Sequence, residues 1–179
     1  MPNPFRNIDS RQVYDNPWIT VIEDRILKPN GTEGIYGKVL FKQLAIGIVP
    51  YADNGDIWLV GQHRYTLDTY EWEIPSGGSS YSDTPVKGAQ RELREETGLL
   101  AEHWEELTRI HLSNSVSNEL GMVFLAQGLT EGETEFDDTE VLEIRRLPFA
   151  EALEMVRRHE ITDSLSVVGI LALADRQRV

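Results

Sequence analysis

Three carboxylates cluster at Glu92, Glu95 and Glu96, shortly after a glycine-rich stretch that begins at Gly77. On a helix, Glu92 and Glu96 lie one turn apart and Glu95 lies beside them. Like charges at this spacing repel, so a helix gains nothing from them unless a cation binds. Mg²⁺ takes carboxylate oxygens and usually keeps waters and substrate phosphates as its other ligands. The spacing therefore favours a Mg²⁺ site, and a solvated acidic face is the alternative for these three residues taken alone.

The residues around the carboxylates predict a helix that holds them in place. Asp83 or Thr84 can cap its start, and Pro85 suits its first turn. Gly98 follows the last turn, where a left-handed conformation is accessible to glycine. One apolar stripe, which can attach the helix to a sheet, consists of Val86, Ala89 and Leu93.

The whole segment resembles the signature of the Nudix hydrolases. Gly77 is followed after five residues by Asp83, and after seven more by Arg91-Glu92-Leu93-Arg94-Glu95-Glu96-Thr97-Gly98-Leu99. The family usually has Glu where this chain has Asp83, which keeps the charge and shortens the side chain. The resemblance implies a mixed sheet between helices, an α/β/α sandwich, and hydrolysis of a nucleoside diphosphate linked to another moiety.

The same resemblance implies a metal site. Glu92 and Glu96 would be direct ligands, Glu95 a third ligand or a shared bridge, and the backbone carbonyl of Ser76 a further oxygen. The expected cofactor is Mg²⁺, with Mn²⁺ as a substitute. Arg91 is expected to orient the carboxylates.

Two further segments resemble the ADP-ribose pyrophosphatase and nucleoside diphosphate sugar branch of the family. They read Gly61-Gln62-His63-Arg64-Tyr65 and Trp72-Glu73-Ile74-Pro75-Ser76-Gly77-Gly78. By this similarity Arg64 would contact a substrate phosphate or sugar, a role that suits a guanidinium, and Glu73 is a further candidate substrate contact. The alternative for Arg64 is an internal salt bridge with Glu73.

In this branch the general base often comes from a late acidic loop. Glu140, which precedes the apolar pair Val141-Leu142, best matches that position, and a carboxylate there could accept a proton from the attacking water. A solvated loop is the alternative for this segment, and Glu95 is the second candidate base.

Relatives use aromatic residues of the N-terminal strands to stack on the nucleobase, which makes Trp18 and Tyr36 candidates. Core packing is the alternative for both. The segment 111–119 is rich in Ser and Asn and contains Glu119, a candidate substrate or metal contact. It has no proline, although ADP-ribose specialists commonly carry one there, so a related nucleotide sugar stays open as the substrate.

Composition limits the remaining classes. The formal net charge of −13 argues against a nucleic-acid-binding surface, and no apolar run is long enough to span a membrane. The absence of cysteine excludes disulfides and fits a cytoplasmic location. The expected partner is a small nucleotide substrate.

The predicted fold is of the α/β or α+β class, with antiparallel N-terminal strands. We expect a β region at 1–42 and a Nudix domain at 43–179. Strands are expected at 18–22, 34–41, 44–50, 57–62, 70–74, 104–111, 121–126 and 141–147, turns at 30–31 and 53–55, and helices at 149–159 and 163–176. The apolar N-terminal strands and the resemblance predict a homodimer through residues 11–41.

Together these features predict a Mg²⁺-dependent hydrolase of ADP-ribose or a related nucleoside diphosphate sugar, giving a nucleoside monophosphate and a sugar phosphate. Two alternatives stay open. One is a broad-specificity housecleaning nucleotide pyrophosphatase, and the other is a sensor of nucleotide sugars that has the fold without the activity.

Overall fold

The computed structural model describes residues 1–132 and 142–177. The chain forms two compact units. The first comprises Met1–Gln43 with His111–Leu120, and the second comprises Leu44–Ile110 with Gly121–Val179. The predicted functional division at residues 42 and 43 stays a prediction.

The first unit is an antiparallel sheet of strand order β1-β2-β3. Its strands are β1 (Arg6–Asp15), β2 (Ile19–Leu27) and β3 (Glu33–Phe41). The predicted turn at Asn30 and Gly31 joins β2 to β3, and Gly31 has a φ of 81°. Strand β1 was not predicted because it is exposed along its whole length and carries no apolar alternation.

The segment between β8 and β9 belongs to this first unit and lies along β3. The backbone N–H of Val39 donates to the carbonyl of Val116 at 2.8 Å, and the N–H of Phe41 donates to Oδ1 of Asn118 at 2.7 Å. The Ser- and Asn-rich segment therefore extends the sheet at its β3 edge.

The second unit contains two sheets in its described residues, with strand orders β10-β5-β6 and β7-β4-β9-β8. The parallel pairing of β4 with β9 places Ala45 opposite Gly121. The strands are β4 (Gln43–Pro50), β5 (Asp56–Arg64), β6 (Thr69–Glu73), β7 (Ser76–Ser80), β8 (Leu99–His111), β9 (Leu120–Glu131) and β10 (Glu143–Pro148).

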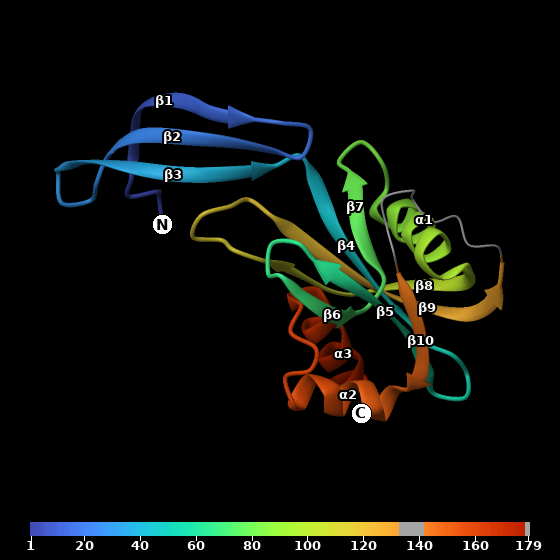
Figure 1. Ribbon diagram of the computed structural model, residues 1–179. Helices are drawn as coiled ribbons and strands as arrows, with labels where there is room; N and C mark the ends of the chain where they lie inside the picture. Colours follow the sequence, from blue (N-terminus) through green and yellow to red (C-terminus); the bar gives the residue numbers. More distant parts are fainter. Residues whose placement is uncertain (133–141, 178–179) are drawn as a thin grey trace. The chain divides into compact units, whose positions relative to one another are not determined.

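Helices cover these sheets from two sides. Figure 1 shows α1 (Pro85–Thr97) on one side of the strands and α2 (Phe149–Arg157) and α3 (Ser164–Arg176) on the other. The predicted cap of α3 is confirmed, because the Asp163 carboxylate accepts from the N–H of Ser166. Side chains with no exposure fill the core between the layers, among them Ile46, Ile48, Leu59, Val60 and Val123. The predicted class, helices combined with a mixed sheet, is confirmed.

No helix in the described parts of the chain combines the length and apolar character needed to cross a membrane.

Candidate active site on helix α1

Helix α1 provides a fixed support for the three carboxylates. It starts with Pro85 after Thr84, whose side chain makes no capping hydrogen bond, and it ends at Gly98, which has a left-handed φ of 69°. Ala89 and Leu93 have no exposed surface. The helix is therefore held by its apolar stripe, as predicted, and by its glycine C-cap, while Thr84 takes the N-cap position without a capping hydrogen bond from its side chain.

Glycines bring β7 and α1 unusually close together. The segment that reads as a glycine-rich turn is in fact the strand β7. A Cβ on Gly77 would overlap the carboxylate of Glu92, and a Cβ on Gly88 would overlap the side chain of Ser79. Glycine weakens a strand but is needed where another group approaches the backbone closely, and this approach was not visible in the sequence.

Arg91 ties two of the carboxylates to β7. Its Nη1 donates to Oε2 of Glu95, and its Nη2 to Oε1 of Glu92, each at 2.5 Å; Nη2 also donates to the carbonyl of Gly78 at 2.7 Å. Burial lowers the pKa of Arg91, but the attraction of Glu92 and then of Glu95 outweighs it and raises the pKa overall. These contacts support the expected orienting role of Arg91.

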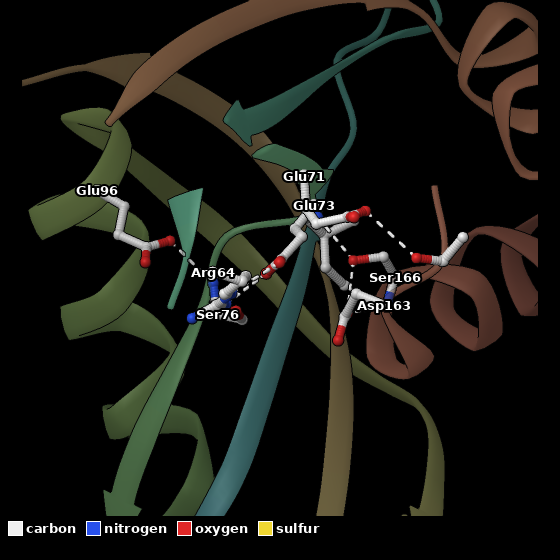
Figure 2. Close-up of polar contacts among 9 residues, drawn as sticks. Arg64, Glu71, Glu73, Ser76, Glu96, Asp163 and Ser166 are labelled. Carbon is white, nitrogen blue, oxygen red and sulfur yellow. Dashed lines mark hydrogen bonds and ion pairs between the residues drawn. The ribbon is translucent and has the colours of Figure 1, made fainter. Parts of the chain in front are cut away.

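Glu96 is anchored to the first residue of the same strand. Its Oε2 accepts a hydrogen bond of 2.9 Å from the backbone N–H of Ser76, the first residue of β7 (Figure 2). Glu96 is 2% exposed and Glu92 is 8% exposed. Two of the carboxylates are thus buried, and each has a defined orientation relative to β7.

The donor set suits a hard divalent cation. Among the described residues, no three acidic or His side chains converge into a single metal-binding group. Mg²⁺ does not require such a cage, because it is usually bound by one or two carboxylates together with water and substrate oxygens. The Arg91 guanidinium between Glu92 and Glu95 also shows that this surface accommodates positive charge.

Comparison with known families identifies the fold and the chemistry together. A family model described as "NUDIX domain" matches residues 41–165 of this chain. The chain is a Nudix hydrolase. A second family model, described as "Nucleoside diphosphate sugar hydrolase N-terminal domain", matches residues 5–39. Nudix hydrolases generally need a divalent metal ion.

Relatives of similar length support the assignment. The chain is 34% identical over 173 residues to an ADP-ribose pyrophosphatase of Mycobacterium tuberculosis, covering 94% of this chain and 83% of the relative. It is 28% identical over 167 residues to an ADP-ribose pyrophosphatase of Bacillus subtilis, covering 92% and 90%. A solved structure titled "Crystal structure of ADP compounds hydrolase" matches with a TM-score of 0.87 at 20% identity, covering 97% of this chain and 94% of that chain.

Outside the Nudix signature, Arg64 and the buried Glu73 form a half-buried ion pair between β5 and β6. Nε of Arg64 donates to Oε1 of Glu73 at 2.7 Å, and Nη2 donates to Oε2 (Figure 2). The hydrogen bonds to Glu73 raise the pKa of Arg64 and outweigh the opposing effect of burial. The internal salt bridge considered as an alternative is therefore present. Both residues also line a pocket of about 320 Å³ with Glu71, Thr162 and Asp163.

The other predicted substrate contacts belong to the first unit. Trp18 is 65% exposed in the single chain, so the alternative interpretation that it packs in the core is wrong. Tyr36 is 39% exposed and donates from its hydroxyl to the carbonyl of Ser115 at 2.7 Å. Glu119 is half-buried. Glu140, the preferred candidate base, lies outside the described residues.

Sequence reasoning missed one buried side chain, Ser166 of α3. Its Oγ accepts from the backbone N–H of Ile74 at 2.9 Å, in the segment that leads into β7. The signal available in the sequence was the Asp163-Ser164-Leu165-Ser166 capping pattern, but the link to Ile74 joins residues that are far apart in the chain.

Proposed function

We propose that this Nudix hydrolase cleaves the pyrophosphate bond of ADP-ribose or a related nucleoside diphosphate sugar and releases a nucleoside monophosphate and a sugar phosphate. The observation that carries this proposal is the similarity to the ADP-ribose pyrophosphatase of Mycobacterium tuberculosis over 94% of this chain and 83% of the relative, in a chain that also matches the N-terminal domain of nucleoside diphosphate sugar hydrolases. The carboxylates on α1 supply the chemistry that such a reaction requires.

Mg²⁺ is the proposed metal, with Mn²⁺ as a substitute. Glu92 and Glu96 would hold it, with Glu95 as a third ligand or bridge and the carbonyl of Ser76 as a further oxygen. When bound, such an ion neutralises phosphate charge and lowers the pKa of an attacking water. The close packing of β7 on α1 supports this set of metal ligands, because it brings the backbone of Ser76 next to the carboxylate of Glu96.

A substrate-binding role is proposed for Arg64 and Glu73, with Arg64 as the direct contact. The Glu73 carboxylate accepts hydrogen bonds from Nε and Nη2 of Arg64. We therefore propose that Nη1 of Arg64 donates to a phosphate or sugar oxygen of the substrate. Glu73 is 2% exposed, so its main contribution is to hold the guanidinium in a single orientation. Trp18 and Tyr36 are proposed to stack on the base, and Glu119 to contact substrate or metal.

Glu140 is the proposed general base, and Glu95 is the second candidate. The ion pair of Glu95 with Arg91 at 2.5 Å supports this order, because that contact already engages one of the Glu95 carboxylate oxygens.

The N-terminal sheet is proposed to form a homodimer interface through residues 11–41. Large apolar side chains are exposed on this unit, including Val13, Tyr14, Trp18 and Ile35. Exposed apolar surface of this kind marks interaction sites.

The test is a hydrolysis screen with Mg²⁺ against ADP-ribose, other nucleotide sugars, dinucleotide polyphosphates and nucleoside triphosphates. Preference for ADP-ribose or another nucleotide sugar is expected. Comparable rates on all classes would favour the housecleaning pyrophosphatase, and binding of a nucleotide sugar with no turnover of any compound would favour the sensor.

A further inference from the structure

Four contacts hold the segment that joins β6 to β7, and all of them lie within the second unit. The Glu73 carboxylate pairs with Arg64, and the N–H of Ile74 donates to Oγ of Ser166 at 2.9 Å. The carbonyl of Pro75 accepts from the N–H of Ile48 at 2.8 Å, and the N–H of Ser76 donates to Glu96 at 2.9 Å. Figure 2 shows the contacts of Glu73, Ser166 and Glu96 along this segment.

Ser166 has a defined hydrogen-bonding direction. Its hydroxyl donates to Oδ2 of Asp163 at 2.7 Å, and Oδ2 also accepts from the N–H of Ser166 at 2.8 Å. An ionised carboxylate can only accept, so the hydroxyl hydrogen points to Asp163 and a lone pair is left for the N–H of Ile74. Ser166 has no exposed surface, which means that water does not replace this acceptor.

Close packing keeps Ser166 in place beside Ile74. A Cβ on Gly47 of β4 would lie 2.9 Å from Cδ1 of Ile74, and a Cβ on Gly169 of α3 would lie 2.8 Å from Cγ1 of Val123. The two glycines therefore let Ile74 and α3 approach the sheet at distances that a larger residue would prevent. The Ser166 contact depends on this approach.

We propose that Ser166 is a positioning residue for the metal site on α1. It fixes the N–H of Ile74, and through the short Pro75 link it fixes Ser76, whose N–H orients Glu96 and whose carbonyl is a proposed ligand. Ser166 touches neither the substrate nor the metal in this arrangement. The inference rests on the proposed function only in that Glu96 and Ser76 belong to the metal site.

The experiment measures Mn²⁺ binding without nucleotide, by electron paramagnetic resonance, in the wild type and in Ser166→Ala. Removal of the hydroxyl leaves the Ile74 N–H without its acceptor. We expect Mn²⁺ binding to weaken by about tenfold, as for other residues that orient metal ligands. Amide hydrogen exchange of Ile74 and Ser76 should accelerate in the same variant, while kcat at saturating metal stays close to that of the wild type.

Two matched variants separate positioning from general destabilisation. Ser164→Ala makes the same substitution at an exposed position of α3, and Ile170→Val removes one buried methyl group one turn beyond Ser166. Both should keep wild-type Mn²⁺ affinity, and Ile170→Val should do so even if it lowers the melting temperature. If Ser166→Ala does not fold, Ser166→Cys replaces the hydroxyl by a weak donor and acceptor and should weaken Mn²⁺ binding in the same direction.

Wild-type Mn²⁺ affinity in folded Ser166→Ala or Ser166→Cys, or an equal loss of affinity in Ile170→Val, would overturn the positioning role. A wild-type protein that binds no Mn²⁺ would overturn the metal site itself and the positioning role with it. A wild-type protein that binds Mn²⁺ but hydrolyses no nucleotide sugar would overturn the substrate proposal and leave the Ser166 comparison intact as a test.

Discussion

Gly77 lies so close to Glu92 that a Cβ on residue 77 would occupy the position of the Glu92 carboxylate. The two residues belong to different elements, β7 and α1. Arg91 links these elements, because it donates both to Glu92 of α1 and to the carbonyl of Gly78 of β7. The glycine at the start of the Nudix signature therefore leaves space for a carboxylate.

Gly77→Ala should displace Glu92 and lower kcat/KM by about tenfold or more, with weaker Mn²⁺ binding, as expected when a metal ligand is moved. The control is the same substitution in a Glu92→Gln background. In that background Gly77→Ala should have little further effect on kcat/KM, because the effects of two substitutions that disturb the same contact are not additive. Equal effects of Gly77→Ala in both backgrounds would contradict the packing explanation.

Glu96→Gln should lower kcat by about 10²-fold or more through loss of a charged ligand. The amide oxygen can still accept from the N–H of Ser76, so the melting temperature should hold or rise slightly as repulsion among the carboxylates falls. Steady-state kinetics with increasing Mg²⁺ and a thermal unfolding scan provide the two measurements. Near-normal turnover at saturating Mg²⁺ would remove Glu96 from the ligand set.

Glu140→Gln should lower kcat with little change in Mn²⁺ affinity, because the residue takes no metal in our proposal. The matched variant is Glu95→Gln, which should weaken metal binding and also break the ion pair with Arg91. The acidic limb of the pH–rate profile should disappear in Glu140→Gln and persist in Glu95→Gln. The reverse pattern would assign the base to the signature helix.

The protein should be a two-fold symmetric dimer in solution. Ile35→Lys places a charge on a side chain that is 71% exposed in the single chain, so it should produce a monomer and weaken substrate binding without loss of the fold. Leu171→Lys, at a 45% exposed position of α3, is the control and should stay dimeric. Light scattering that reports a fully active wild-type monomer would exclude the dimer.

Asp24 should contribute to acid sensitivity. Hydrogen bonds from the Lys38 ammonium, and then from the Ser10 hydroxyl, hold the pKa of the Asp24 carboxyl below its usual range. A carboxyl with a depressed folded-state pKa stabilises the fold above its unfolded pKa of about 3.9, and this stability is lost as the pH falls through the folded value.

Asp24→Asn should therefore be less stable than the wild type at pH 7 but lose less stability on acidification below about pH 4. Urea unfolding at both pH values measures the difference. Glu105→Gln, which breaks an exposed pair with Arg176, should change the pH dependence less because solvent screens that pair. Parallel losses in the wild type and in Asp24→Asn would show that Asp24 is not responsible.

Local patterns were sufficient to predict the elements that carry their own signals. The helix between Pro85 and Gly98 and the cap at Asp163 depend on residues within one turn of each other. The turn at Gly31 likewise requires only the positive φ that glycine permits. The spacing of the signature carboxylates belongs to this class, because one short segment contains them all.

Only the tertiary structure decided the contacts between distant segments. Strand β7 reads as a turn because its glycines carry no strand signal, and its pairing with β4 and packing on α1 override that weak preference. The addition of residues 111–120 to the N-terminal sheet and the Ser166 contact with Ile74 also join residues that are far apart along the chain. Local sequence does not encode such pairs, because their free energy comes from backbone hydrogen bonds and close packing that exist only once the chain has folded.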